Sequence, residues 1–372
     1  MSTKKILPHT SFSFVRLRKS YLVLGACLVL SACLLLSACG KKNRYQDQFM
    51  DVFDTVSLVI GYEGNEGDFQ KNFKAVHKRL QELHQLFDVY DDYPGVQNLK
   101  YVNENAGTAP VKVDPEIMAL LKFGKEIYEK TDGNIAYGAV LRIWHDYREA
   151  GIANPENASL PEEEALLEAS KHCNIEDLIL DEENSTVYFR DPELRLDVGG
   201  IAKGWSVERA AELLEEAGAK HYLLNIGGNL RAIGKRGDGK RWVCPVENPF
   251  YVDGQDEEQF AVAGEIENTS LVTSGDYERF YVVNGKRYAH IVDPRTMMPA
   301  DRHRSVSILT KDSGLADGLS TALFILDVEE GKALLKKIQD GGTDVEAMWI
   351  EPDGTQDYTE NFLTKISAEA DS

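Results

Sequence analysis

Beyond an apolar stretch in the first forty residues, apolar and polar positions alternate along the chain with two different periods. Apolar residues at spacings of three and four predict amphipathic helices at 68–86, 114–131, 202–217 and 315–326. Short apolar runs between turn residues predict strands at 52–62, 186–189, 194–198, 221–226, 305–310 and 345–354. The Asn284-Gly285 pair predicts a hairpin, which favours an α+β fold over a doubly wound parallel sheet. We expect mixed, partly antiparallel sheets with packed helices in a single domain of two interlocked halves.

The first 38 residues have the layout of a secretory signal, with five cations ahead of an apolar run at 21–36. The following Leu36-Ser37-Ala38-Cys39 looks like a bacterial lipobox, so we expect Cys39 to be the lipidated first residue of the mature protein. Cys33 stands in a similar pattern, but cleavage there would leave an apolar tail. The alternative is an uncleaved membrane anchor. Either way we expect an extracytoplasmic protein tethered to a bacterial membrane, with a signal at 1–38, a linker at 39–48 and one domain at 49–372.

The formal charge limits the possible partners. Without the five cations of the expected signal, the charge of −20 becomes −25. Such an acidic domain repels nucleic acid and anionic lipid surfaces, and a phosphate ligand would need local cations or a metal. Cys173 and Cys244 are the only cysteines after Cys39, so one disulfide or two buried thiols are possible, but no zinc site is.

A candidate anion site lies at Asp197-Val198-Gly199-Gly200, where a predicted strand runs directly into a helix. The two glycines let the backbone approach a ligand, and free N–H groups at the helix start favour a phosphate. Lys203 adds a positive charge in the first turn. The alternative is a plain tight turn, and the spacing is not that of the dinucleotide-binding fingerprint.

A candidate metal site lies in the helix at 315–326. Asp317 and Thr321 are four residues apart and Ser320 is three beyond Asp317, so all three share one face. A carboxylate with hydroxyls suits Mg²⁺, which often shares its ligand shell with substrate phosphates. The alternative is that these residues cap the helix.

His290 stands between a predicted strand and a turn, in the segment Tyr288-Ala289-His290-Ile291-Val292-Asp293-Pro294. A lone histidine of this kind is structural in most proteins. Its reference pKa near neutrality also suits it to proton transfer.

Taken together, these segments resemble the ApbE family of FAD:protein FMN transferases. The matching segments, in order, are MDVFDT (50–55), LFDVYDD (86–92), GNIAYGAVLRIWHDYR (133–148), DVGGIAKGWSVERAAELL (197–214), NIGGN (225–229), TSGDYERF (273–280), HIVDPRT (290–296) and ADGLSTALF (316–324). They span nearly the whole chain after the expected signal. This chain has Met297 where the family usually has glycine after DPRT.

The resemblance implies that FAD is cleaved at its pyrophosphate, that FMN is joined to a threonine hydroxyl of an acceptor protein as a phosphoester, and that AMP leaves. It implies Mg²⁺ on Asp317, Thr321, the Gly200 carbonyl and possibly Ser320, where some relatives carry a second carboxylate. His290 would be the general base. FAD contacts would fall on Met50, Tyr90, Val140, Leu141, Arg142, Asp197, Lys203 and Ile291.

The resemblance also implies an acceptor with a Ser/Thr-Gly-Ala-Thr-type motif, such as a subunit of an Rnf complex or a sodium-translocating NADH:quinone oxidoreductase. Two alternatives stay open on the sequence. An FAD pyrophosphatase would use water in place of the acceptor, and a non-catalytic FAD-binding lipoprotein would release no AMP. A solute-binding lipoprotein would need two lobes and a hinge, for which the sequence gives no sign.

Overall fold

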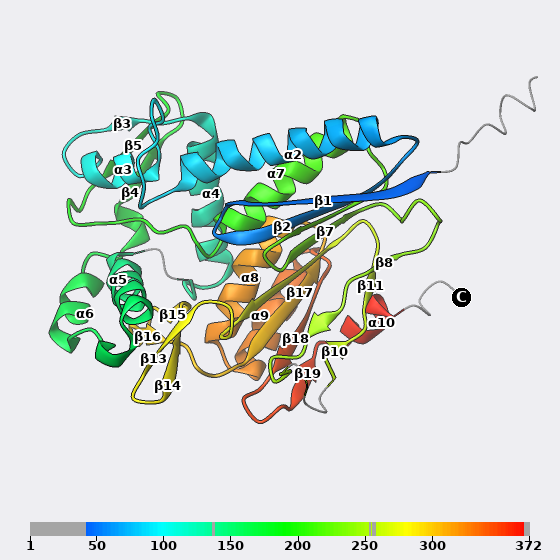
Figure 1. Ribbon diagram of the computed structural model, residues 1–372. Coiled ribbons are helices and arrows are strands. Elements are labelled where there is room, and N and C mark those ends of the chain that lie inside the picture. Colours follow the sequence, from blue (N-terminus) through cyan, green and yellow to red (C-terminus); the bar gives the residue numbers. More distant parts are fainter. Residues whose placement is uncertain (1–41, 136–137, 253, 255–257, 368–372) are drawn as a thin grey trace, which may run out of the picture. The chain divides into compact units, whose positions relative to one another are not determined.

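An eight-stranded antiparallel sheet forms the centre of the computed structural model, which describes residues 42–135, 138–252, 254 and 258–367. Its strands run in the order β1-β2-β6-β7-β12-β17-β18-β19 (Figure 1). Their bounds are β1 Asn43–Val52, β2 Thr55–Glu63, β6 Tyr222–Ile226, β7 Asn229–Ile233, β12 Ser270–Gly275, β17 Ser305–Thr310, β18 Val345–Ile350 and β19 Gln356–Tyr358. Every recorded strand pairing in it is antiparallel, including β1 with β2 and β12 with β17. Cys39, the expected lipidation site, lies outside the described residues.

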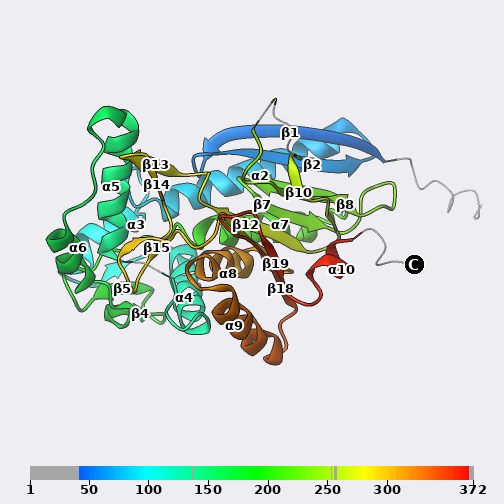
Figure 2. The ribbon, with the colours of Figure 1, turned by 90° about the horizontal axis from the view of Figure 1, so that it is seen from below.

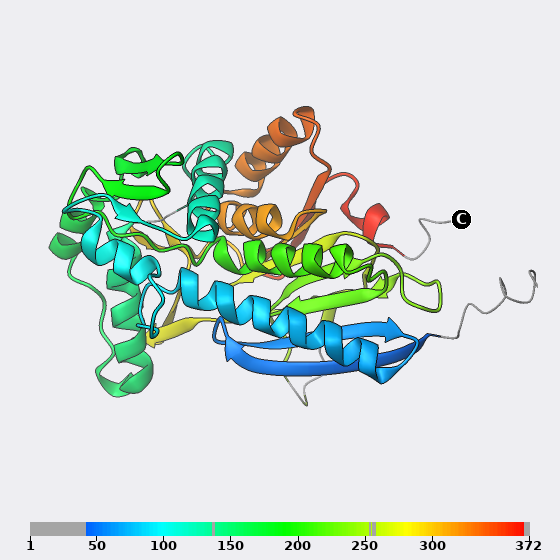
Figure 3. The same ribbon diagram turned by 90° about the horizontal axis from the view of Figure 1, so that it is seen from above.

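Four helices pack on one face of this sheet: α2 (Glu66–Phe87), α7 (Ala202–Glu216), α8 (Ser313–Ile325) and α9 (Val328–Asp340). Helices α2 and α7 run side by side, as Figures 1 and 3 show. Helix α8 packs between α7 and the strands β12 and β17, and eleven of its thirteen residues are buried. The helix that carries Asp317 is therefore held on two sides.

Shorter elements cover the opposite face. They are β8 (Trp242–Val243) with β11 (Glu265–Ile266), β9 (Val246–Glu247) with β10 (Phe260–Val262), and α10 (Phe362–Ile366). Apolar side chains of the sheet, among them Leu223 and Met348, pack there against Trp242 and Phe362. Figure 2 shows α10 beside β18 and β19. The sheet is thus buried on both faces, which explains the continuous burial along β17 and β18.

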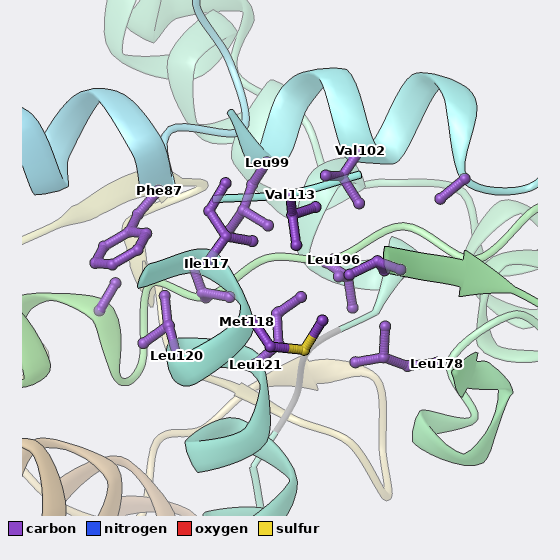
Figure 4. Packing of buried hydrophobic residues seen from close by; sticks show 14 of the residues in the cluster. Phe87, Leu99, Val102, Val113, Ile117, Met118, Leu120, Leu121, Leu178 and Leu196 are labelled. Carbon is purple, nitrogen blue, oxygen red and sulfur yellow. The ribbon is translucent and has the colours of Figure 1, made fainter. Parts of the chain in front are cut away.

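A separate hydrophobic cluster holds α3 (Leu99–Asn105), α4 (Pro115–Lys130) and a three-stranded sheet of β3 (Val111–Lys112), β5 (Thr186–Phe189) and β4 (Leu178–Asp181). Figure 4 shows Ile117 and Leu121 of α4 between Phe87 and Leu178. Val198 and Ile201 belong to the same cluster. The segment that leads into α7 is therefore anchored by apolar packing on both sides of the two glycines.

A further layer carries the residues around His290. It comprises α5 (Ala139–Ala153), η1 (Pro155–Asn157), α6 (Glu163–Ser170), the hairpin β13 (Phe280–Val283) with β14 (Lys286–Ala289), and β15 (Val292–Asp293) with β16 (Met298–Pro299). The short η2 (Ile175–Asp177) instead packs with the cluster of α3 and α4 through Ile175. Trp144 of α5 stacks on Tyr288 of β14 with ring centroids 6.1 Å apart. This contact ties the helix to the hairpin.

The predicted helices are confirmed as α2, α4, α7 and α8, within a few residues at their ends. The strand predicted at 52–62 is wrong at its start, because a turn at Phe53-Asp54 separates β1 from β2. The strand predicted at 194–198 is also wrong, since this segment is extended but pairs with no strand in the described part of the chain. The other strands predicted from 186 onward and the Asn284-Gly285 hairpin are confirmed.

Cys173 and Cys244 are free, so of the two possibilities the structure shows separate thiols. Burial raises the pKa of the Cys244 thiol to about 12. Among the helices of the described residues, none is long and apolar enough to cross a bilayer.

Candidate active site

A cavity of about 660 Å³ opens where α7 and α8 meet the β13–β14 hairpin, α5 and the β1–β2 turn. The predicted site residues that line it are Tyr90, Leu141, Asp197, Gly200, Lys203, His290, Ile291, Asp317 and Thr321. Segments far apart in the sequence therefore meet around one space. Its volume is in the range of cavities that hold cofactors.

The start of α7 forms one wall of the cavity. Its N-cap residue Ile201 makes no side-chain hydrogen bond to the helix, but the Gly204 N–H of the first turn donates to Asp317 of α8 and the Ala202 N–H donates to the Val198 carbonyl. The Gly199 N–H is not free, because it donates to Asp197 Oδ1 at 2.8 Å. Lys203 donates from Nζ to the Gly227 carbonyl at 2.8 Å, which holds its ammonium in the cavity wall. The positive charge of the junction therefore comes from the Lys203 ammonium. The prediction of free N–H groups at the helix start is wrong for Gly199, Ala202 and Gly204, whose amides are bound within the fold.

Asp317 projects from α8 toward this junction and is 5% exposed. Its Oδ2 accepts a hydrogen bond of 2.7 Å from the Gly204 N–H. Helix α7 can come this close because residue 204 is glycine; a Cβ there would clash with the Ser313 carbonyl and with the Asp317 side chain. Burial raises the pKa of Asp317, and the charge of Lys203 and the Gly204 N–H oppose that rise.

Two neutral oxygens complete this group. The Thr321 hydroxyl lies 3.5 Å from the Gly200 carbonyl oxygen, and both residues line the cavity beside Asp317. One buried carboxylate with a hydroxyl and a carbonyl fits Mg²⁺, because a cation would offset the cost of the buried charge. Among the described residues, no three His, Cys, Asp or Glu side chains gather as a metal cluster, so this oxygen set is the candidate.

Ser320 is placed differently from the other predicted metal donors. Its side chain is fully buried, and its hydroxyl donates to the Asp317 carbonyl at 2.9 Å and lies 2.7 Å from the Ser274 hydroxyl. It does not line the cavity. In this structure Ser320 ties α8 to β12.

His290 lies directly after β14, on the far side of the cavity from α7. Its backbone N–H and its ring Nδ1 are 3.0 Å and 3.2 Å from the Arg279 carbonyl oxygen. A carbonyl can only accept, so Nδ1 carries the proton and Nε2 keeps its lone pair. Burial, together with the charges of Arg279, Arg148 and Lys203, lowers the pKa of His290 to about 3. The ring is therefore neutral near pH 7 and can accept a proton.

The predicted FAD contacts fall into two groups, those that line the cavity and those that do not. The second group is Met50, Val140 and Arg142. Tyr90 donates to Asp197 Oδ2 at 2.8 Å and stacks on His145 with ring centroids 4.0 Å apart. The guanidinium of Arg142 lies 5.0 Å from the centre of the Tyr90 ring, although Arg142 does not line the cavity. Val140 is buried in the core of the α5 layer, and Met50 on β1 is 64% exposed. The contacts predicted for Met50, Val140 and Arg142 stay predictions.

Several lining residues had no role in the sequence analysis, although they stand in the matched segments. Arg148 and Arg279 add two cations to that of Lys203, and Glu278 adds a carboxyl whose pKa is raised by burial. Asn229, at the end of NIGGN, does not line the cavity and is fully buried, and its amide lies close enough to Asp317 to favour the ionised carboxylate, although no complete hydrogen bond joins them. The only sequence signal for these residues was their place in the motifs.

These features define a protein that binds a phosphate-bearing ligand beside a neutral histidine, and comparison with known proteins gives the family. The chain belongs to the ApbE family, whose model matches residues 50–348. It is 33% identical over 322 residues to a protein of Treponema pallidum (81% of this chain, 85% of the relative), and 32% identical over 279 residues to one of Haemophilus influenzae (73% and 77%). Both relatives are named FAD:protein FMN transferase.

Solved structures agree with this assignment. The ApbE protein of Thermotoga maritima is 26% identical, with a TM-score of 0.74, and the match covers 87% of this chain and all of that one. The flavin transferase ApbE of Vibrio cholerae is 26% identical, with a TM-score of 0.69, over 86% of this chain and 98% of that one. The expected α+β fold is confirmed.

Proposed function

We propose that this protein transfers the FMN part of FAD to a hydroxyl side chain of an acceptor protein and releases AMP. Family membership and the names of the relatives support this activity. The observation that carries it here is one cavity with two ends, the Lys203 ammonium and Asp317 at one end and a neutral His290 at the other. Such a site can hold a diphosphate and also accept a proton from a hydroxyl.

The cations in the cavity reconcile an acidic chain with a polyanionic substrate. Lys203, Arg148 and Arg279 line the cavity, and their charges act together on His290. A diphosphate that binds between them gains charge-assisted hydrogen bonds in a partly enclosed site. Phosphoryl-type transfer depends mostly on such positioning and charge neutralisation.

A magnesium ion would be held by the Asp317 carboxylate, the Thr321 hydroxyl and the Gly200 carbonyl, which face one another at the cavity wall. When bound, Mg²⁺ supplies Lewis-acid polarisation of phosphate oxygens and neutralises their charge. The buried Asp317, with its raised pKa, is the group that gains most from a nearby cation.

His290 would act as the general base. Its Nε2 accepts the proton of the acceptor hydroxyl while the hydroxyl oxygen attacks the flavin-side phosphorus. The bond from this phosphorus to the bridging oxygen breaks, and AMP leaves with that oxygen. The Arg279 carbonyl keeps its hydrogen bond to Nδ1–H and so holds the ring in place while it is protonated.

The acceptor is what the family resemblance implies, and the location of the reaction is an expectation from the first forty residues of the sequence. We propose an acceptor segment of the Ser/Thr-Gly-Ala-Thr type, on a subunit of an Rnf complex or a sodium-translocating NADH:quinone oxidoreductase. We also propose that Cys39 carries a lipid, so that the reaction takes place at the outer side of a bacterial membrane. Palmitate labelling of the wild-type chain and of a Cys39→Ala variant tests the anchor, and label that persists in the variant would contradict it.

The activity is tested by incubating the protein with FAD, Mg²⁺ and an acceptor domain that carries such a motif. Mass spectrometry of the acceptor peptide should show the mass of FMN less water on a threonine, with one AMP released per flavin attached. Free FMN with an unmodified acceptor would show a pyrophosphatase instead. FAD binding without any AMP would show a binding protein.

A further inference from the structure

The β1–β2 turn at the edge of the cavity has an unusual backbone. Val52 pairs with Thr55, so the loop between them has only two residues, Phe53 and Asp54. Both have left-handed φ angles, 53° and 51°. Two-residue hairpin loops with this geometry normally contain Asn-Gly or Asp-Gly, because most side chains disfavour the left-handed region. Both residues line the cavity, so strain is stored at the site itself.

Two side chains hold this turn, and a backbone hydrogen bond holds the strand that follows it. The Phe53 N–H donates to His84 Nδ1 of α2 at 3.4 Å. The Phe53 carbonyl accepts from Arg279 Nη2 at 2.7 Å. On the other side, the Gly227 N–H donates to the Val56 carbonyl at 3.2 Å, and the carbonyl of Gly227 is the one that binds Lys203. The turn is therefore connected to the phosphate side through Gly227 and to the acceptor side through Arg279.

Arg279 makes two connections at once. Its carbonyl accepts from both N–H groups of His290, whereas its guanidinium binds the peptide of Phe53. A single residue, Arg279, therefore connects the turn to His290, the candidate base. Within the described residues Arg279 forms no ion pair. Its guanidinium binds the turn, and its charge acts on His290.

We propose that the hydrogen bond from Arg279 to the Phe53 carbonyl holds the Phe53-Asp54 turn over the His290 end of the cavity and thereby favours the acceptor hydroxyl over water as the nucleophile. We call this hydrogen bond the latch. This proposal rests on the proposed function. With the acceptor, its oxygen bonds to the flavin-side phosphorus, AMP leaves and the proton goes to His290. With water, the same bond to AMP breaks, but the products are free FMN and AMP. A turn held over His290 limits access of bulk water, whereas an unlatched turn admits it.

The role of Arg279 is one of positioning, so its test must separate the latch from its charge. Arg279→Lys keeps the positive charge but loses the planar group that reaches the Phe53 carbonyl. His84→Phe removes the acceptor of the Phe53 N–H without removing a cation. Lys286→Gln is the control, because Lys286 lies in the β13–β14 hairpin but does not line the cavity, and its 58% exposed side chain contacts the exposed Asp301 and the ring of Tyr288.

Two quantities are measured on the full chain with FAD, Mg²⁺ and the acceptor domain: the ratio of flavinylated acceptor to free FMN, and hydrogen exchange of the amides at 53–56. Because the hydrogen bond from Arg279 to Phe53 is exposed, we expect Arg279→Lys to lower the ratio by about threefold to tenfold. His84→Phe should lower it less. Exchange at 53–56 should rise in both variants, and Lys286→Gln should match the wild type in both measurements.

An unchanged ratio in Arg279→Lys, despite faster exchange at 53–56, would overturn the proposal. Unchanged exchange would overturn it too, because the turn would then not depend on Arg279. A fall of transfer and hydrolysis by the same factor would show a role in phosphate binding alone, and the latch would again be wrong. Failure of the proposed function is seen separately, in the wild-type protein, as an acceptor that never gains FMN.

Discussion

On one side of the cavity the residues expected to hold phosphate lie on two helices that interlock, whereas on the other side the base lies at the end of a two-stranded hairpin. Gly204 lets α7 and α8 approach until its N–H reaches Asp317. Behind them, the buried Arg231 binds Glu208 of α7 from Nε and Nη2, both at 3.0 Å, and Glu208 accepts from the Ser313 N–H that opens α8. This side is fixed by buried contacts.

The acceptor side of the cavity, around His290, is held by fewer contacts. His290 depends on one carbonyl of the β13–β14 hairpin, and the turn opposite it is held by single hydrogen bonds to His84 and Arg279. The difference corresponds to two tasks. A rigid side presets the positions of charges before the reaction, and a side held by few contacts can open to admit a protein segment.

Removal of the Asp317 carboxylate should have the largest effect on activity, because this carboxylate is the only charged group proposed to bind the metal. Asp317→Ala should lower both transfer and FAD hydrolysis by about 10³-fold or more, since metal-assisted charge stabilisation contributes several kcal/mol. Initial rates of AMP release measure this. Asp312→Ala is the control on the same helix: it removes the cap that accepts from the Leu315 N–H and should cost about 1 kcal/mol of stability with activity kept. Equal losses in both variants would contradict the role of Asp317.

The base on the acceptor side should come next. His290→Ala should slow transfer by roughly 10²–10⁴-fold and leave the dissociation constant of FAD nearly unchanged, because the imidazole is expected to contact the hydroxyl rather than the flavin phosphates. Single-turnover flavinylation and FAD titration give the two values. Loss of FAD binding in step with transfer would count against a base.

The buried ion pair behind the phosphate side allows a stability test. Glu208→Gln leaves Arg231, which is 1% exposed, without its full counter-charge, and should lower the free energy of unfolding by about 3–5 kcal/mol. Urea denaturation measures it. Glu215→Gln is the matched control, because Glu215 is 39% exposed and 3.4 Å from Arg231, and it should cost less than about 1 kcal/mol. Similar losses in both variants would show that burial does not decide the effect.

The pH dependence of stability should reflect the neutral state of His290. Its pKa falls from near 6.5 in the unfolded chain to about 3 in the folded protein, so between these values the unfolded state binds more protons. The contribution of His290 to stability is therefore complete above about pH 6.5 and declines as the pH falls toward 3. Unfolding of His290→Gln across this range should show a shallower decline than the wild type, and parallel curves would contradict the assignment.

Tyr90→Phe should give the smallest change. It removes the hydroxyl that donates to Asp197 but keeps the ring stacked on His145. One neutral-to-charged hydrogen bond at the edge of the cavity contributes about 1–2 kcal/mol, so FAD affinity should weaken by roughly fivefold to thirtyfold. Fluorescence titration with FAD measures it. No change would show that Tyr90 acts through its ring alone.

The rigid side could be predicted from sequence because its signals are local. The glycines before α7, the period of α7 and α8 and the spacing of Asp317 and Thr321 all lie within single elements. The latch could not be predicted in this way. Phe53-Asp54 has no glycine or asparagine to mark a turn, so the segment reads as one strand, and the partners of Phe53 lie 31 and 226 residues away.

Long-range contacts also explain the other segments whose conformation differs from the sequence-based prediction. Residues 194–198 have a strand-like composition, but Leu194, Leu196 and Val198 are buried against α3 and α4 instead of being paired in a sheet. Met297, at the turn after Thr296, adopts a left-handed φ of 62°, and its carbonyl accepts from Trp144 at 2.7 Å. Tertiary contacts hold these segments in conformations that their own residues do not favour.

A crystal structure with FAD and Mn²⁺ in place of Mg²⁺ tests the central claim most directly. If the proposed metal site is right, an anomalous manganese peak should lie among Asp317, Thr321 and the Gly200 carbonyl, with the diphosphate between Lys203 and the His290 side of the cavity. Metal and diphosphate bound together at another place, or FAD bound with no manganese near Asp317, would contradict it.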